Sequence, residues 1–502
     1  MTAAEWPRPR RLTGAPLTFE AYWAGLNWTR LRKNVLRLQV RIAKAVRERR
    51  WGKAEALQWL LSRSWSAKLL AVRRVVTNRG KNTPGVDGVL WRTGEEIVRG
   101  ARSLKRRGYK PDALRRVYIP KSNGKKRPLG IPTMQDRAMQ ALYLMGLIPV
   151  AETLADPNSY GFRPKRSAAD AIGQCFIALA KKHSPQWVLD ADIKACFDRI
   201  DHEWLIRYVP MDTQVVRKWL KAGFVEDDVF HETEAGTPQG GIASPTMANV
   251  ALDGLEAAAK AAVPRRGAKV NVIRYADDFV ITGASKELLE TRVIPAVRAF
   301  LEERGLHLSK EKTRLVHIEE GFDFLGFNVL KYDGKLLIKP APKSVQAFLQ
   351  KIRELVTKHV ASPTEVLIRQ LNSKLRGWGH YYRGVVAKKT FYRIDKAIYG
   401  YLHRWMRRRH PGRQMTWIRR RYYRRLGTRS VFHAYVETKE GKRERLDLMR
   451  IGDIPIKRHV KVQAGATPYD PRYLDYFRRR WRRLSDRRKA DQRHLSLVTA
   501  PW

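Results

Sequence analysis

Cysteine is almost absent from this chain, and its scarcity excludes two classes of structure. Only Cys175 and Cys196 occur in 502 residues. Two cysteines cannot supply a disulfide framework or a Cys-based zinc site, so we expect a reducing, intracellular setting. No apolar run is long enough to span a bilayer, and residues 1–14 lack the apolar core of a secretory signal. The sequence therefore predicts a cytoplasmic protein that is not inserted in a membrane.

Acidic residues are also scarce in comparison with basic ones. The chain has 48 Asp and Glu against 100 Lys and Arg, a formal net charge of +52. Such an excess implies a long polyanionic partner, meaning nucleic acid, rather than a small acidic substrate.

One stretch, between Asp395 and Glu437, has no acidic residue at all. Arginine clusters alternate there with aromatic residues, a combination that neutralises phosphates and stacks on bases. The alternative is that the aromatic residues belong to a core and the arginines to ordinary solvated surface. The candidate nucleic-acid contacts are Arg407, Arg408, Arg409, Arg419, Arg420 and Arg421.

Two adjacent carboxylates, Asp277 and Asp278, follow Tyr275 and Ala276 at a bend between two apolar runs. The alternation of aromatic and β-branched residues predicts two strands, with Asp278 and its neighbours forming the turn between them. Hard oxygen ligands at the tip of a hairpin could bind Mg²⁺. A solvated turn is the alternative, and a third carboxylate is needed to decide between the two interpretations.

Asp192 is the candidate for that third carboxylate. It lies near the end of the apolar segment 187–193, which predicts a buried strand, and a charge there is costly unless it is paired or bound to metal. Two metal ions about 3.5–4 Å apart require shared carboxylates. We expect Asp192 and Asp277 to hold both ions. Asp278 should only assist, because consecutive strand residues face opposite sides and Asp278 therefore points differently from Asp277. An acidic strand-to-helix turn at the surface is the alternative for Asp192.

Eight sequence blocks, in order, resemble those of group II intron reverse transcriptases, also called intron-encoded maturases. They are TNRGKNTPGVDGV, RRVYIPKSNGKKRPLGIPTMQDRAMQ, SYGFRPKRSA, WVLDADIKACFDRIDH, GTPQGGIASPTMANVAL, IRYADDFVI, GLHLSKEKTRLVHI and GFDFLGFNV. The resemblance implies an α+β fold of the right-hand polymerase type. Its expected parts are a basic helical N-terminal extension at 1–77, fingers and an antiparallel palm sheet at 78–335, a helical thumb or maturase domain at 336–437, and a small basic DNA-binding domain at 438–502.

The activity implied by this resemblance is that of an RNA-directed DNA polymerase with two Mg²⁺ ions and deoxynucleoside triphosphates as substrates. Its implied partners are intron RNA in a ribonucleoprotein, an RNA template with a DNA primer, and target DNA, in a bacterial nucleoid-associated setting. The family implies assistance to splicing and retromobility by target-primed reverse transcription. A non-enzymatic splicing cofactor and a domesticated reverse transcriptase in defence or repair are the alternatives, and homodimerisation is left open.

The chain departs from many members of the family near its C-terminal end. No paired Cys-x-x-Cys motif of an HNH endonuclease module is visible, and His494 stands alone. We therefore do not expect this chain to cleave the second strand of a DNA target.

The resemblance also implies that particular residues of this chain contact the nucleotide. Phe197 would pack under the sugar and exclude a 2′-hydroxyl group, with a core aromatic as the alternative. Arg163 would contact template or nucleotide, with a structural turn as the alternative. A backbone carbonyl near Ile193 would complete one metal coordination shell. The other expected nucleotide contacts are Lys121, Arg127, Gln239, Gly240 and Lys312.

Past residue 339, apolar residues recur at helical spacing in three successive segments, 345–356, 367–378 and 391–405. This pattern predicts three amphipathic helices. Ser362 is the predicted N-cap of the second helix, with Pro363 at its first position and Glu365 completing a capping box.

Overall fold

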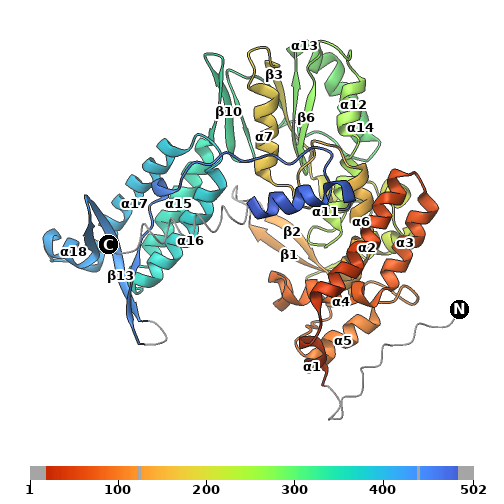
Figure 1. The fold of residues 1–502 in the computed structure, drawn as a ribbon, viewed down its shortest axis with the longest axis horizontal. Coiled ribbons are helices and arrows are strands. Elements are labelled where there is room, and N and C mark those ends of the chain that lie inside the picture. The colour runs from red at the N-terminus through yellow and green to blue at the C-terminus, as the bar shows by residue number, and fades with distance from the viewer. Residues whose placement is uncertain (1–17, 121–123, 125, 438–440, 484–502) are drawn as a thin grey trace.

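The computed structural model describes residues 18–120, 124, 126–437 and 441–483. Its elements form an α+β architecture with four separate sheets among the described residues. Figure 1 shows helices of the N-terminal part at one end of the molecule, a second group of helices at the opposite end, and strands between them. None of the helices within the described ranges combines the length and the apolar composition that crossing a bilayer requires.

The N-terminal helices pack together and against the long helix α6. Their bounds are α1 Phe19–Ala24, α2 Trp28–Arg47, α3 Trp51–Arg63, α4 Trp65–Thr77, α5 Gly94–Ser103 and α6 Met134–Leu154. Helix α2 buries Val35, Ile42 and Val46, as its helical spacing predicts. Helix α4 contacts α6 along the same core. The helical character predicted for residues 1–77 is confirmed for the described part of that segment.

A small sheet with strand order β2-β1-β4-β5 lies beside these helices. Its strands are β1 Leu114–Pro120, β2 Lys126–Ile131, β4 Phe224–Glu226 and β5 Val229–His231. Strands β1 and β2 form the antiparallel hairpin that corresponds to the predicted fingers. Lys121 lies outside the described residues.

The sheet that carries the predicted catalytic carboxylates is antiparallel and has the order β6-β7-β3-β8. Its strands are β3 Trp187–Asp192, β6 Asn271–Tyr275, β7 Asp278–Gly283 and β8 Arg314–His317. The strand predicted at 187–193 is confirmed as β3, whose interior is buried. An antiparallel palm sheet is therefore confirmed.

Short helices surround this sheet, and both α7 and α12 contact strand β6. The helices are α7 Ala168–Leu179, α8 Cys196–Arg199, α9 His202–Tyr208, α10 Thr213–Leu220, α11 Ser244–Leu252, α12 Leu255–Ala261, α13 Lys286–Leu288 and α14 Ile294–Glu302. Because they cover the sheet, its apolar residues are removed from water and its polar end is held in a fixed position.

The group of helices at the opposite end follows a further three-stranded sheet. The elements are β9 Phe322–Phe324, β10 Phe327–Tyr332, β11 Lys335–Pro340, α15 Pro342–Lys358, α16 Thr364–Tyr382 and α17 Lys388–Arg409. The three predicted helices are confirmed. The predicted cap of the second is wrong: Pro363 is the N-cap of α16 and no side chain caps it. The carbonyl of Ser362 instead accepts a hydrogen bond from Arg409 at 2.5 Å.

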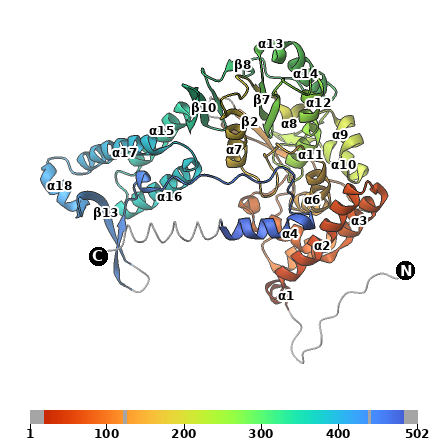
Figure 2. The ribbon, with the colours of Figure 1, turned by 45° about the horizontal axis from the view of Figure 1, so that its top comes forward.

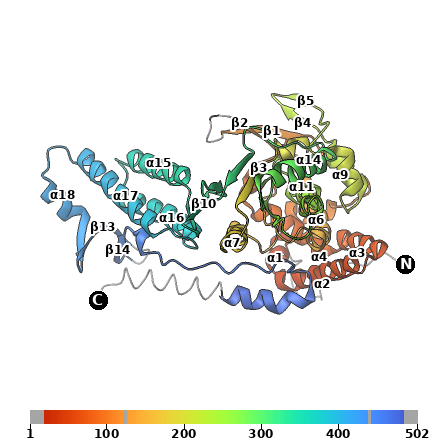
Figure 3. The ribbon, with the colours of Figure 1, turned by 90° about the horizontal axis from the view of Figure 1, so that it is seen from above.

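The described chain ends with a small sheet and a segment that returns toward the N-terminal helices. Its named elements are α18 Met415–Tyr422, β12 Tyr423–Leu426, β13 Arg429–Glu437 and β14 Arg443–Asp447. Figures 2 and 3 show the chain after β14 running back past α7 to a helix at 474–483 beside α2 and α4. An ion pair of 2.9 Å between Arg47 and Asp470 joins this returning segment to α2.

Candidate active site

The register of the palm sheet brings Asp192 directly opposite Asp278 on the adjacent strand. Residues that are directly opposite in an antiparallel pair project from the same face. Tyr275 pairs with Asp278, so Ala276 and Asp277 form the two-residue turn, and Ala276 takes a left-handed φ of 60°. The prediction that Asp278 belongs to the turn is therefore wrong, because Ala276 and Asp277 form the turn and Asp278 begins β7. The weaker role predicted for Asp278 stays a prediction.

Asp277 is joined to the end of β3 by the backbone. The amide of Ile193 donates a hydrogen bond to the Asp277 carbonyl at 3.3 Å. The side chain of Ile193 is buried in the core, so only its backbone could contact a metal ion. All three candidate carboxylates consequently lie at one end of the palm sheet.

The pKa values of these carboxyl groups show that negative charge is crowded here. Burial first, and then repulsion from Asp190, Asp192 and Asp277, raises the pKa of Asp278 to about 7. Burial, followed by repulsion from Asp192, also raises the pKa of Asp277. Burial raises the pKa of Asp190 to about 6 although Arg314 opposes the shift. Sequence reasoning missed Asp190, which precedes Asp192 by two residues and so faces the same side of β3.

One lysine partly balances the negative charge of these carboxylates. Nζ of Lys312 lies 2.8 Å from Oδ2 of Asp192, and this hydrogen bond raises the pKa of the lysine. No three His, Cys, Asp or Glu side chains in the described ranges are grouped as they would be around an ion. The donor set nevertheless fits Mg²⁺ in chemistry, because a divalent cation prefers carboxylate oxygen and would relieve the repulsion that raises these pKa values.

The turn is supported from behind by a buried cation. Arg274 is 1% exposed and forms a 2.5 Å ion pair with Asp253. Its guanidinium also donates to the side-chain oxygen of Asn249 at 3.1 Å. A Cβ at Gly161 would lie 2.3 Å from the amide nitrogen of Ala276, so the segment after Tyr160 packs directly on the turn. Sequence reasoning missed both Arg274 and Gly161, although a cation inside an apolar strand signals a buried partner.

The predicted nucleotide contacts Arg127 and Gln239 lie together. Nε of Arg127 donates to Oε1 of Gln239 at 2.7 Å. Gly240 has a φ of 117°, and a Cβ there would lie 2.6 Å from the carbonyl oxygen of Gly130 in β2. Only glycine satisfies both the backbone angle and this close approach. The structure thus joins the loop 236–241 to the fingers hairpin.

Phe197 lies under an exposed aromatic ring. It is 9% exposed, and its ring meets the ring of Phe162 edge to face at a centroid distance of 6.1 Å. Phe162 itself is 52% exposed. Because Phe197 both contacts the core and borders the site, its role in excluding a 2′-hydroxyl group stays a prediction.

Arg163 does not have the predicted contact role. It is 7% exposed, and its guanidinium forms a two-bond ion pair with Glu152 at 2.8 and 3.1 Å. It also donates to the carbonyls of Asp156 and Ser159. These bonds hold its fork inside the protein, so the structural alternative is correct for Arg163.

The arginine clusters of the helical region differ in exposure. Arg409 is half-buried and donates to the carbonyl of Val360 at 3.1 Å, so part of its guanidinium is used inside the protein and its nucleic-acid contact stays a prediction. The exposed members are Arg407, Arg408, Arg419, Arg420 and Arg421. Among the interleaved aromatic residues, Trp405 and Tyr422 are buried, whereas Trp417 is 39% exposed.

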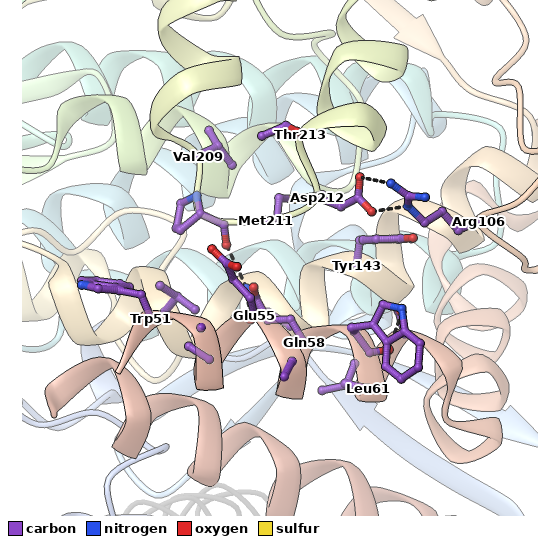
Figure 4. Close-up of a pocket in the computed structure, with 18 of the residues that line it drawn as sticks. Trp51, Glu55, Gln58, Leu61, Arg106, Tyr143, Val209, Met211, Asp212 and Thr213 are labelled. Carbon is purple, nitrogen blue, oxygen red and sulfur yellow. Dashed lines mark hydrogen bonds and ion pairs between the residues drawn. The ribbon is translucent and has the colours of Figure 1, made fainter. Parts of the chain in front are cut away.

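A separate cavity of about 720 Å³ lies between helix α3 and the segment joining α9 to α10. Figure 4 shows Trp51, Glu55 and Gln58 of α3 facing this segment, and Asp212 bonded to Arg106 at the far side. Gln58 donates to the carbonyl of Pro210 at 2.8 Å. None of the predicted site residues lines this cavity, so it is distinct from the carboxylate site.

Three family models match the chain in consecutive segments. The N-terminal domain of reverse transcriptase matches residues 23–104, reverse transcriptase (RNA-dependent DNA polymerase) matches 119–329, and the group II intron maturase-specific domain matches 345–423. Carboxylates 192, 277 and 278 all fall within the second segment.

Curated relatives agree with these matches. Protein YkfC of Escherichia coli (strain K12) is 32% identical over 316 residues, which cover 55% of this chain and 82% of the relative. The group II intron-encoded protein LtrA of Lactococcus lactis subsp. cremoris is 28% identical over 410 residues, which cover 62% of this chain and 68% of the relative. A telomerase structure from Candida albicans has a TM-score of 0.36 at 13% identity over 59% of both chains, a likeness too remote to support an assignment. The chain belongs to the group II intron-encoded reverse transcriptases, which join an RNA-directed DNA polymerase to a maturase domain.

Proposed function

We propose that this chain copies RNA into DNA at a site formed by Asp192, Asp277 and Asp278, with two Mg²⁺ ions and deoxynucleoside triphosphates. The observation that carries the proposal is the β3–β7 register, which sets Asp192 opposite Asp278 beside the turn that holds Asp277. When bound, the ions would lower the pKa of the primer 3′-hydroxyl and neutralise the leaving pyrophosphate. The three carboxylates would hold both ions, and the backbone carbonyl near Ile193 would supply one further oxygen.

The incoming nucleotide is held by residues from both the fingers hairpin and the palm. Arg127 offers a planar fork to the triphosphate, and Lys312 acts as a point charge. Lys312 pairs with Asp192 in the structure, and its side chain is largely exposed, so its ammonium group could also reach a phosphate beside that carboxylate. Gln239 and Gly240 line the loop beside the nucleotide, and Phe197 excludes a 2′-hydroxyl group. Lys121 belongs to the same group by sequence.

The basic surface serves intron RNA and the template–primer duplex. A net charge of +52 supports extensive phosphate contact. The exposed arginines of α17 and α18 lie within or beside the maturase-specific segment, so we assign them to intron RNA bound to assist splicing. We assign 1–77 to the N-terminal extension, 78–335 to fingers and palm, 336–437 to the thumb, and 438–502 to binding target DNA during target-primed synthesis.

A non-enzymatic splicing cofactor is the second candidate function. Such a protein would need the basic surface but not three carboxylates at one end of a sheet. The energetic cost of crowding Asp190, Asp192, Asp277 and Asp278 favours the enzymatic function, because an unused site would gain stability by losing one of these charges.

Primer extension on a structured RNA template tests the proposal. We expect incorporation of deoxynucleotides but not of ribonucleotides, and Asp277→Ala should abolish it while RNA binding is kept. Asp228→Asn, on the exposed β4–β5 turn, is the matched control and should extend primers normally. Extension that persists in the Asp277 variant would refute the metal assignment.

A further inference from the structure

A hydrogen-bond chain joins strand β2 of the fingers to helix α8 of the palm through one glutamine. Arg127 donates from Nε to Oε1 of Gln239 at 2.7 Å. Nε2 of Gln239 then donates to both carboxylate oxygens of Asp198, at 2.8 and 2.9 Å. Asp198 directly follows Phe197 and had no role in the sequence predictions.

The chemistry of the two outer partners fixes the orientation of the amide between them. A guanidinium group can only donate hydrogen bonds, and an ionised carboxylate can only accept them. Gln239 must therefore turn its oxygen to Arg127 and its NH₂ group to Asp198. The orientation of this amide depends on Asp198 because only an acceptor at that position holds the NH₂ group.

The loop backbone is fixed independently of this side chain. The amide of Gly130 donates to the carbonyl of Gln239 at 2.7 Å, and the amide of Thr237 donates to the carbonyl of Phe197 at 2.6 Å. Loss of the Asp198 carboxylate would therefore free the amide of Gln239 to rotate while its loop stays in position. A rotated amide would place its NH₂ group against the Nε–H of Arg127, and these two donors repel each other.

We propose that Asp198 is a positioning residue for the incoming nucleotide, acting through Gln239 to hold the Arg127 guanidinium where the triphosphate binds. The inference rests on the proposed function. The Nε–H group of Arg127 donates to Gln239, so its two Nη groups remain available to donate side by side to phosphate oxygens. The exposed Arg127 also lies close enough to Asp277 to oppose the rise in the pKa of that carboxyl group, which is caused chiefly by burial.

The test is a set of steady-state measurements of primer extension on an RNA template, with deoxynucleotide titrated at saturating template–primer. Asp198→Asn has nearly the same shape but presents both a donor and an acceptor, so it no longer fixes the amide of Gln239. We expect its KM for deoxynucleotide to rise about ten-fold with kcat within about two-fold, because prepositioning of Arg127 is lost and the metal site is unchanged. Asp228→Asn is the control, and thermal unfolding of each variant verifies that it folds.

A double-mutant cycle separates positioning from a merely structural role. In the Gln239→Ala background, Asp198→Asn should cause no further rise in KM, because the glutamine that transmits its effect is gone. The inference is overturned if Asp198→Asn leaves KM unchanged, or if it raises KM equally with and without Gln239. A wild-type chain that extends no primer would instead refute the proposed function, whereas an active wild type matched by Asp198→Asn would refute only this inference.

Discussion

Nη2 of Arg480 lies 3.1 Å from Oδ1 of Asp170, although 310 residues separate the two positions. The same oxygen accepts hydrogen bonds from Nε2 of His459 and from the amide of Val462, each at 2.8 Å. The Asp170 side chain is 1% exposed. A buried carboxylate on the palm helix α7 therefore anchors the segment that returns from the helical end of the molecule.

Removing this anchor should destabilise the protein. Asp170→Ala leaves the Arg480 guanidinium and the Val462 amide inside the protein without their acceptor. Breaking a buried ion pair from one side costs about 3–5 kcal/mol, so we expect a clear fall in the Tm measured by calorimetry. We also expect limited proteolysis to cut the chain after residue 456 faster than in the wild type, because the returning segment detaches.

An exposed ion pair in the same segment provides the control for Asp170. Asp475 and Arg478 pair at 3.1 Å with both side chains largely exposed, at 78% and 73%. Asp475→Ala should leave Tm nearly unchanged, because exposed pairs contribute at most about 1 kcal/mol. Equal, small effects of the two substitutions would show that Asp170 does not anchor the segment.

Gly240→Ala should damage nucleotide binding through a steric conflict. The added Cβ would lie 2.6 Å from the Gly130 carbonyl oxygen, so either the loop or strand β2 must move. We expect primer extension to fall by more than about ten-fold, since small displacements of positioning groups have large effects on rate. Gly412→Ala is the control for a positive backbone angle: its φ is 79°, and nothing lies within 4 Å of the new Cβ. Similar activities for the two variants would contradict the importance of this contact.

Local patterns predicted the elements better than the contacts between them. The alternation around residues 270–281 and the apolar run at 187–193 predicted strands because strand periodicity is local. The residue at which the second strand begins could not be predicted in this way, although a turn shifted by one residue reverses the side on which every later residue lies. The same limit applies across long separations. Gln239 and Asp198 are 41 residues apart, and no periodicity connects them.

The error at Arg163 has a different cause. Arg163 lies in a turn next to other basic residues, Lys165 and Arg166, and such a turn has the composition of a phosphate contact. Its partner Glu152 lies 11 residues earlier, inside helix α6, and that burial is a property of the folded chain alone.

Crowding of carboxylates should make the stability of the metal-free protein depend on pH. Burial and the neighbouring carboxylates raise the pKa of Asp278 to about 7 when the chain is folded, against about 3.9 when it is unfolded. A carboxyl group with a raised pKa stabilises the fold fully only below about pH 3.9, and this contribution is lost as pH rises through about 7.

Asp278→Asn, which does not ionise, should consequently have a higher Tm than the wild type at about pH 8 in EDTA. Its advantage should exceed about 1.4 kcal/mol, the free energy of one pKa unit, and should shrink as pH is lowered toward about 4. Mg²⁺ should raise the Tm of the wild type more than that of the variant. A Tm difference that does not change with pH would mean that Asp278 is not protonated in the metal-free site.

The exposed arginines of α18 should account for part of the salt dependence of RNA binding. Arg419, Arg420 and Arg421 are exposed at the last turn of this helix, beside the exposed ring of Trp417. Each phosphate contact adds about 0.7–0.9 to the slope of log affinity against log salt concentration, because binding releases counterions. Replacing the three arginines with glutamine should therefore lower the slope by roughly 2–3 and weaken binding most at low salt.

Filter binding of a structured RNA at several salt concentrations measures this slope directly. Arg99→Gln, on α5, is the control because its guanidinium already pairs with Glu95 at 2.5 Å and is not assigned to RNA. It should leave the slope unchanged. A triple variant with an unaltered slope would show that these arginines belong to solvated surface, and the phosphate contacts would then have to come from other basic residues of the chain.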